Sequence, residues 1–279
     1  MKINNILTVK NLCKKYEKFS LDNVSFSLEK GKITGFIGRN GAGKTTTLKS
    51  LLNFVHPDSA DIKFFGKTFD EAENEIKQRI GFVSGGINYY SKSKIKSITN
   101  TTKRFYNNWD DKAYLKYLDL FNLDESKTPS MLSEGMKVKY SLALALSHNA
   151  ELLILDEPTS GLDPVSRDEL LDIFLKLSED EITILFSTHI TSDLDKCADN
   201  IIYIKNGRVL AESNIEKYVQ DYRVLELNDS KAQELKDKLI GCKKSKHGYS
   251  ALIKADDCQG IDGVKPADLE DIMVHIEKE

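Results

Sequence analysis

A glycine-rich stretch near the start of the chain constrains the fold more than any other feature. It runs from Gly38 to Thr45, reads Gly-Arg-Asn-Gly-Ala-Gly-Lys-Thr, and fits the pattern G-x-x-x-x-G-K-[ST]. Residues 32–37 before it are typical of a short buried strand, and residues 45–53 after it predict a helix. A loop of this pattern between a strand and a helix indicates an α/β fold that binds the phosphates of a nucleotide.

The residue types in this loop, residues 38–45, suit a bound triphosphate. Phosphate oxygens need close backbone N–H groups, and side chains at Gly41 or Gly43 would hinder that approach. Lys44 is long enough to reach the β- and γ-phosphates, and the hydroxyl of Thr45 is a suitable ligand for Mg²⁺. The residues that we expect to contact the nucleotide here are Gly38, Asn40, Gly41, Ala42, Gly43, Lys44, Thr45 and Thr46.

Two acidic residues follow a second apolar strand pattern. Residues 152–155 read Leu-Leu-Ile-Leu and precede Asp156 and Glu157. Parallel sheets present ligand-binding groups at the carboxyl ends of their strands. We therefore expect Asp156 to hold Mg²⁺ through water and Glu157 to polarise an attacking water. The stretch by itself also fits a strand that ends in acids capping the next helix.

Composition excludes some classes of function. The 279 residues contain 40 Lys+Arg and 43 Asp+Glu, so the net charge of −3 does not indicate a nucleic-acid or anionic-lipid partner. The four cysteines lack C-x-x-C spacing, which argues against a metal or disulfide framework and fits a reducing cytoplasm. No apolar stretch reaches 18 residues and no leader pattern is present, so we expect no membrane-spanning segment.

The hydrophobic pattern divides the chain into two parts. Alternating residues in 6–31 predict antiparallel strands, and residues from about 86 to 147 predict a helical subdomain, with helices near 95–106 and 112–121. Both belong to a domain over residues 1–221. Residues 222–279 predict a small α+β appendage that includes a helix over 231–239.

Three more motifs follow the phosphate loop. They are Leu-Ser-Glu-Gly-Met at 132–136, Ser-Gly-Leu-Asp at 160–163 and Ser-Thr-His at 187–189. Over residues 6 to about 215, the chain resembles the ATP-binding subunit of ATP-binding-cassette (ABC) transporters. This resemblance implies a P-loop NTPase of the ABC ATPase type, α/β in class, with an antiparallel β-subdomain and a helical subdomain.

The resemblance also implies roles for residues outside the phosphate loop. Ser133 and Gly135 would bond the γ-phosphate of a nucleotide held by a partner subunit, and Asp163 would lie at the dimer interface. His189 would bond the γ-phosphate, and Tyr16 would stack on adenine. A serine and a glycine N–H at a helix start are chemically suited to bind an anion. The expected catalytic residues are Glu157, His189 and Lys44.

The chain departs from the family's pattern in two places, one at Gly85 and one in the motif at 132–136. Gly85 stands where the family usually has a glutamine that contacts Mg²⁺ and the reacting water. Glycine has no side-chain amide, so metal contact there needs another group. In the motif at 132–136, Glu134 and Met136 replace the usual glycine and glutamine, and we expect Glu134 to point away from the phosphate. Tyr89 and Tyr90 follow Gly85, and they either meet the membrane subunit or cover the local core.

A narrower resemblance indicates the kind of transporter. Leu-Ser-Glu-Gly-Met-Lys at 132–137 and Ser-Thr-His-Ile-Thr-Ser-Asp-Leu at 187–194 look like the ATPases of bacterial exporters with GntR-type regulators. Such exporters carry antimicrobial peptides or phenol-soluble modulins. The resemblance implies ATP and Mg²⁺ as cofactors, a head-to-tail dimer that is homo- or heteromeric, and a separate transmembrane subunit at the cytoplasmic face of the membrane.

Two other functions stay open at the level of sequence. One is a soluble ABC-type ATPase that acts on a nucleic acid or a ribosome. Repair-type members carry a long coiled coil between the motifs, but Lys44 and Ser133 are only about 90 positions apart, and ribosomal members carry two cassettes. The other is a regulatory ATP binder that does not hydrolyse. Glu157 and His189 argue against it, whereas Gly85 favours it.

Overall fold

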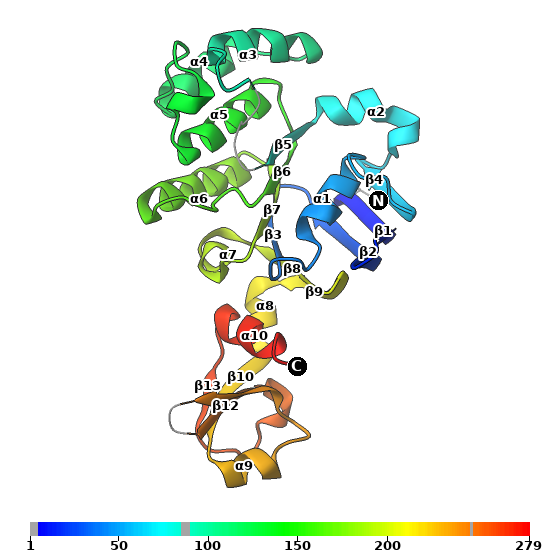
Figure 1. Ribbon diagram of the computed structural model, residues 1–279, viewed down its shortest axis with the longest axis vertical. Coiled ribbons are helices and arrows are strands. Elements are labelled where there is room, and N and C mark those ends of the chain that lie inside the picture. The colour runs from blue at the N-terminus through cyan, green and yellow to red at the C-terminus, as the bar shows by residue number, and fades with distance from the viewer. Residues whose placement is uncertain (1–4, 85–89, 246–247) are drawn as a thin grey trace.

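A six-stranded sheet forms the centre of the molecule (Figure 1). The computed structural model describes residues 5–84, 90–245 and 248–279. The strand order is β5-β6-β7-β3-β8-β9, in which the first five strands are parallel and β9 pairs antiparallel with β8 at one edge. The strands are β3 (Ile33–Ile37), β5 (Ile80–Ser84), β6 (Leu152–Asp156), β7 (Thr183–Thr188), β8 (Asn200–Lys205) and β9 (Arg208–Asn214).

Both faces of this sheet are buried, which explains its nearly continuous apolar strands. Successive residues of a strand point to opposite faces. Leu153 and Leu155 pack into the core beneath the helices shown on the left of Figure 1, whereas Leu152 and Ile154 pack into the core around α1. The helices on the two faces are α1 (Lys44–Leu51), α5 (Glu134–Ser147), α6 (Pro164–Glu179) and α7 (Thr191–Cys197).

A three-stranded antiparallel sheet covers the face of the central sheet that carries α1. Its order is β2-β1-β4, and Val9 of β1 lies opposite Phe26 on one side and Ile62 on the other. The antiparallel strands predicted for residues 6–31 are therefore present. Ser27 donates from its backbone N to Glu212 Oε1 over 2.9 Å, which ties this sheet to β9. The strands are β1 (Asn5–Lys15), β2 (Ser20–Glu29) and β4 (Ser59–Phe64).

Helices lie beyond β5, at the end of the molecule opposite the C-terminus (Figure 1). Buried hydroxyls of Thr99, Tyr114 and Tyr140 form hydrogen bonds of 2.7–2.8 Å that join α3, α4 and α5. The helix predicted near 95–106 is shorter than expected, because α3 ends at Thr102 and continues as a 3₁₀ turn. The remaining helices of this region are α2 (Phe69–Gln78), α3 (Ile95–Thr102) and α4 (Asp111–Leu120).

The C-terminal segment forms its own antiparallel sheet in the order β11-β12-β10-β13. The helix expected over 231–239 is shorter, since α9 ends at Glu234 and β11 follows. The pattern missed β11 because four of its six residues are exposed. The elements are α8 (Ile215–Gln220), β10 (Tyr222–Leu227), α9 (Asp229–Glu234), β11 (Ile240–Ser245), β12 (Gly248–Lys254), β13 (Val264–Pro266) and α10 (Leu269–Ile276).

Helix α10 joins this segment to the central sheet. Leu269, Ile272 and Ile276 belong to the same buried core as the helices α5 to α7. Lys205 of β8 donates to the carbonyl of Ile276 over 2.7 Å, where a cation also favours a helix C-terminus. The segment 222–279 is therefore packed on the main body rather than tethered to it.

Within the part of the chain that the structure describes, no helix combines the length and the apolar character needed to cross a membrane.

A buried histidine, His148, connects the end of α5 to the end of α2. The ring of His148 is 3% exposed and stacks on Tyr106 with 3.7 Å between ring centroids. Its Nδ1 donates to the carbonyl of Gln78 over 3.1 Å. Burial lowers the pKa of His148 from 6.5 to about 4, because the charged ring loses hydration.

This pKa predicts acid sensitivity of the fold. Between pH 6.5 and 4 the unfolded chain binds a proton at His148 that the folded chain does not, so stability falls as pH falls through this window. The loss should reach about 3 kcal/mol. Urea unfolding at pH 7 and pH 4 should show that loss in the parent and a smaller one in His148→Phe, which keeps the stacking ring. His56→Phe, which removes an exposed histidine, is the control, and equal losses in all three proteins would contradict the prediction.

Candidate active site

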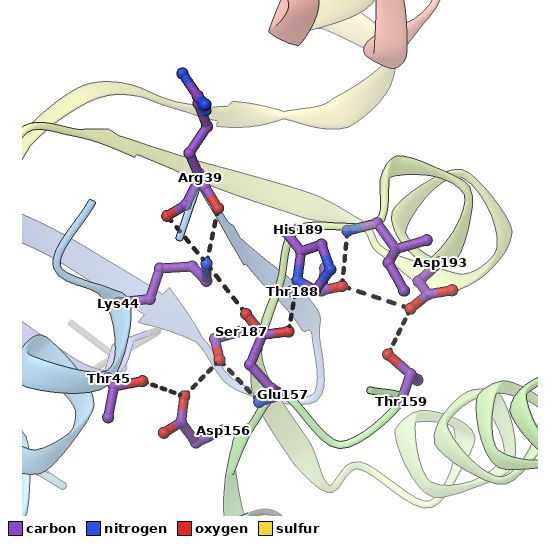
Figure 2. Close-up of polar contacts among 12 residues, drawn as sticks. Arg39, Lys44, Thr45, Asp156, Glu157, Thr159, Ser187, Thr188, His189 and Asp193 are labelled. Atoms are coloured by element: carbon purple, nitrogen blue, oxygen red, sulfur yellow. Dashed lines mark hydrogen bonds and ion pairs between the residues drawn. The ribbon is translucent and has the colours of Figure 1, made fainter. Parts of the chain in front are cut away.

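Three chain segments meet at the carboxyl edge of the central sheet. In the parallel register, Ile37 at the end of β3 lies beside Thr188 of β7, and Asp156 at the end of β6 lies beside Ser187. The phosphate loop, the acidic pair and His189 each begin where one of these strands ends. Figure 2 shows Lys44, Asp156, Glu157 and His189 gathered around this edge.

The phosphate loop leads directly into α1. Gly38 is buried, whereas residues 39–41 are exposed. Helix α1 begins at Lys44, and no side chain caps its first N–H groups or places an acid in its first turn. Free N–H groups and the positive end of a helix dipole favour an anion at this position.

The two glycines singled out from the sequence are required for different reasons. Gly43 has φ +113°, and an added Cβ would lie 2.7 Å from Leu21 Cδ2 and 2.8 Å from Phe19 Cζ. Gly41 has φ +85°, but an added Cβ would meet nothing within 4 Å. A side chain at Gly43 therefore requires Leu21 and Phe19 to shift, a constraint that the sequence did not reveal.

A chain of charged groups crosses the site. Lys44 is 5% exposed, and its Nζ lies 2.7 Å from the carbonyl of Gly38 and 3.1 Å from Glu157 Oε1. The second carboxylate oxygen, Glu157 Oε2, accepts a hydrogen bond of 2.9 Å from Nδ1 of His189. The carboxylate therefore lies between the ammonium and the imidazole, and the three predicted catalytic residues are adjacent.

The backbone of Glu157 is strained. Its φ is +50°, in the left-handed region that a side chain disfavours. The N–H of Glu157 donates to Ser187 Oγ over 2.9 Å, and its carbonyl accepts from the N–H of Ser160 over 3.2 Å. Strained residues of this kind persist where surrounding bonds fix them, and they cluster at functional sites.

Oxygen atoms that suit Mg²⁺ lie beside this chain. Thr45 Oγ1 donates to Asp156 Oδ1 over 3.1 Å, and Ser187 Oγ donates to the same oxygen over 2.8 Å. A hydroxyl and a carboxylate are hard oxygen ligands of the type that Mg²⁺ prefers. Among the described residues, no cluster of three or more His, Cys, Asp and Glu could hold a metal. The oxygens in question at this edge are the hydroxyl of Thr45 and the carboxylate of Asp156. That donor set fits a Mg²⁺ that is held largely by phosphates and water.

Ser187 is a site residue that sequence reasoning left without a role. Its hydroxyl accepts a hydrogen bond from the backbone N–H of Glu157 and donates one to the carboxylate of Asp156, so it bridges the two acidic residues. Its signal in the sequence is a hydroxyl residue at the end of the buried strand β7, next but one to His189.

The residues expected to act on a partner's nucleotide lie elsewhere. Ser133 caps α5 by accepting from the N–H of Met136 over 3.2 Å, and Glu134 pairs with Lys137 Nζ over 2.6 Å. Ser133 and Gly135 line a groove of about 750 Å³ between α4, α5 and α6. Within the described residues, neither is hydrogen bonded to the phosphate loop or to the acidic pair.

Asp163 caps α6 at the end of the loop that follows the acidic pair. It accepts from the N–H groups of Val165 and Ser166 over 3.0 Å and from the Ser166 hydroxyl over 2.6 Å. The hydrogen bond from the Ser166 side chain holds the pKa of Asp163 below its usual range. Asp163 is therefore a carboxylate exposed at a helix start.

Of the three tyrosines singled out from the sequence, the structure describes Tyr16 and Tyr90. Tyr16 follows β1 and is 44% exposed, with Lys14 Nζ 5.9 Å from the centre of its ring. Tyr90 is 69% exposed and has φ +54°. Gly85 and Tyr89 lie outside the described residues.

The fold and the sheet edge together define a P-loop nucleotide hydrolase. The model of the ABC transporter family matches residues 21–160. The bacitracin transport ATP-binding protein BcrA of Bacillus licheniformis is 33% identical over 81% of this chain and 76% of its own length. The Nod factor export ATP-binding protein I of Burkholderia orbicola (strain AU 1054) is 33% identical over 73% of this chain and 69% of its own length.

A solved structure agrees with these relatives. The structure of an ATP-binding subunit of an ABC transporter superposes with a TM-score of 0.68 and 26% identity, covering 76% of this chain and 91% of that one. The chain belongs to the ABC transporter family, as an ATP-binding subunit. Its activity is ATP hydrolysis.

The difference between the two loop glycines can be tested by stability. Gly43→Ala combines a left-handed backbone with contacts under 3.0 Å, whereas Gly41→Ala has only the unfavourable backbone. Thermal unfolding without nucleotide should show that Gly43→Ala is less stable than Gly41→Ala by about 1–3 kcal/mol, the usual cost of overpacking. Equal melting temperatures for the two variants would show that Leu21 and Phe19 do not restrict this position.

Proposed function

We propose that this ATPase powers the export of a peptide or another amphipathic compound by a separate transmembrane subunit. The observation that carries the catalytic part is the chain Lys44–Glu157–His189 at the carboxyl edge of the sheet, with contacts of 3.1 and 2.9 Å. Support for the cargo comes from relatives named for bacitracin transport and Nod factor export.

Each residue of the chain has a distinct part in the proposed mechanism. The phosphate-loop N–H groups and the Lys44 ammonium stabilise charge on the β- and γ-phosphates. Glu157 accepts a hydrogen bond from the attacking water and orients it toward the γ-phosphate. His189, fixed by the bond from its Nδ1 to Glu157, would bond the γ-phosphate through Nε2 as negative charge develops there, a step that uses the ring with a proton on both nitrogens.

Thr45 and Asp156 are the residues that would hold Mg²⁺ in this proposal, Asp156 through a water. The bound metal would supply positive charge that neutralises the phosphates. Ser187 orients Asp156 by donating to its Oδ1, which leaves the other carboxylate oxygen for the metal's water shell. Tyr16 is placed to stack on the adenine, since its ring is partly exposed just after β1.

We propose a head-to-tail dimer, because one chain cannot complete the site alone. Ser133 and Gly135 lie at the start of α5, on the other side of β5 and β6 from the phosphate loop and α1 (Figure 1). A second ATPase subunit turned about a two-fold axis would bring these groups onto the γ-phosphate, with Asp163 at the interface. Closure of that dimer on ATP would supply the conformational work.

The position in the cell follows from this assembly. The subunit would lie on the cytoplasmic face of the membrane, bound through the transmembrane subunit. We further propose that residues 1–221 form the ATPase domain and that 222–279 affect assembly or regulation, since the catalytic chain lies entirely in the first part. Tyr90, which is exposed, is our candidate for contact with the transmembrane subunit.

Glu157→Gln tests the proposed mechanism. The amide keeps the shape of the side chain but loses the charge that orients water, so turnover should fall at least 100-fold while ATP still binds. ATP-bound protein should then accumulate as a dimer, which size-exclusion chromatography with ATP and Mg²⁺ would detect. A variant that hydrolyses at the parental rate would refute the role of Glu157.

Lys44→Ala is the matched variant for binding. Removing the buried ammonium deletes a direct contact to the phosphates, so ATP affinity itself should fall more than tenfold and no ATP-dependent dimer should form. Isothermal titration with ATP separates this defect from that of Glu157→Gln. If Lys44→Ala binds ATP as tightly as the parent, the phosphate loop is not the nucleotide site.

A further inference from the structure

A buried carboxylate lies behind the site and has no place in the mechanism above. Asp193, in α7, is 1% exposed, and its Oδ2 accepts from Thr159 Oγ1 over 2.6 Å. Thr188 Oγ1 lies at a longer 3.5 Å from the same oxygen. Figure 2 shows Asp193 between these two hydroxyls, away from Lys44.

Burying this group is costly for the fold. The other oxygen, Asp193 Oδ1, has no hydrogen-bond partner among the described residues, and neither has Nε of Arg167, which lies 3.9 Å from it. Burial raises the pKa of the Asp193 carboxyl above its usual range, which reflects the lost hydration. A buried and incompletely bonded carboxylate calls for an explanation other than stability.

The explanation is in what the two hydroxyls are attached to. Thr159 follows Glu157 by two residues, and Thr188 directly precedes His189. The side chain of Asp193 therefore links the backbone segment that leaves Glu157 to the segment that enters His189. Both threonines are fully buried, so these links are shielded from water. The 2.6 Å bond from Thr159 is the strong one, and the 3.5 Å contact of Thr188 is weaker.

The strained backbone of Glu157 explains what the link through Asp193 does. The left-handed backbone of Glu157, φ +50°, is unfavourable for a non-glycine residue and persists only where neighbouring bonds hold it. Ser187 fixes the N–H side of Glu157, and Thr159, held by Asp193, fixes the chain that follows. If the following segment relaxed, the Glu157 carboxylate would move relative to His189.

We propose that Asp193 is a positioning residue for hydrolysis: through Thr159 and Thr188 it holds Glu157 and His189 in their mutual geometry. Within the part of the chain that the structure describes, Asp193 is hydrogen bonded neither to the phosphate loop nor to the side chains of Glu157 and His189. This inference depends on the roles proposed for Glu157 and His189. It adds a third partner, on α7, that the geometry of those two residues requires.

Thr159→Val is the sharpest test, because it removes the hydroxyl and keeps the shape of the side chain. We expect kcat to fall about tenfold while the affinity for ATP, measured by titration, changes less than twofold. Thr159→Ser restores the donor and should recover most of kcat. The full-length protein is used, with kcat calculated per nucleotide-binding site so that a misfolded fraction does not lower the value.

A matched control distinguishes positioning from stability. Thr99→Val also removes a buried threonine hydroxyl that makes two short hydrogen bonds, but in α3, away from the sheet edge. It should lower the melting temperature without lowering kcat. If Thr159→Val lowers the melting temperature yet keeps the parental kcat, Asp193 serves only the fold and the proposal is overturned.

The double variant shows whether the link acts through the catalytic residues. In a His189→Ala background, Thr159→Val should have a much smaller effect on kcat than in the parent. Thr159 is proposed to act by holding Glu157 relative to His189, and that geometry no longer matters once the His189 ring is removed. Fully additive effects would count against the proposal. An active Glu157→Gln would instead refute the mechanism on which it rests, so the two failures are separable.

Discussion

Parallel pairing of β6, β7 and β3 brings three segments that are far apart in the chain to one edge of the central sheet. Because the register aligns the ends of these strands, Lys44, Glu157 and His189 meet within hydrogen-bonding distance. The apolar cores on both faces keep the strands in that register, since a shift by one residue would move every side chain of a strand into the opposite core, which is packed around other residues. The catalytic geometry therefore depends on packing that is remote from the nucleotide.

Buried hydrogen bonds of Ser187 and Asp193 fix the backbone around Glu157, which apolar packing alone would not hold in place. Ser187 connects Asp156 to the backbone of Glu157, and Asp193 holds the segment beyond it. These groups are buried, so each missing bond would leave an uncompensated polar atom. Such networks are expensive, and their location beside a strained glutamate explains why the fold retains them.

In the proposed dimer, each molecule contributes two separate halves of a nucleotide site. One half, the phosphate loop and sheet edge, is built around β3, β6 and β7, whereas the other, Ser133 and Gly135, lies at the start of α5. This separation makes ATP itself the bridge between subunits in the proposed dimer, so binding energy is available for movement. The segment 222–279 is linked by α10 to β8. Strand β8 pairs with β3, the strand that leads into the phosphate loop.

The sequence alone determined the class of fold and the family, and it predicted the catalytic residues, because the G-x-x-x-x-G-K-[ST] loop and the strand ending in two acids need contiguous residues of fixed chemistry. It also indicated the antiparallel and helical regions through their hydrophobic periods. It did not reveal the roles of Ser187 and Asp193, or the contacts of Phe19 and Leu21 that restrict Gly43. These roles and contacts join residues that are tens of positions apart in the chain, and Ser187 and Asp193 are ordinary polar residues as far as the sequence shows. Only the tertiary structure brings such partners together.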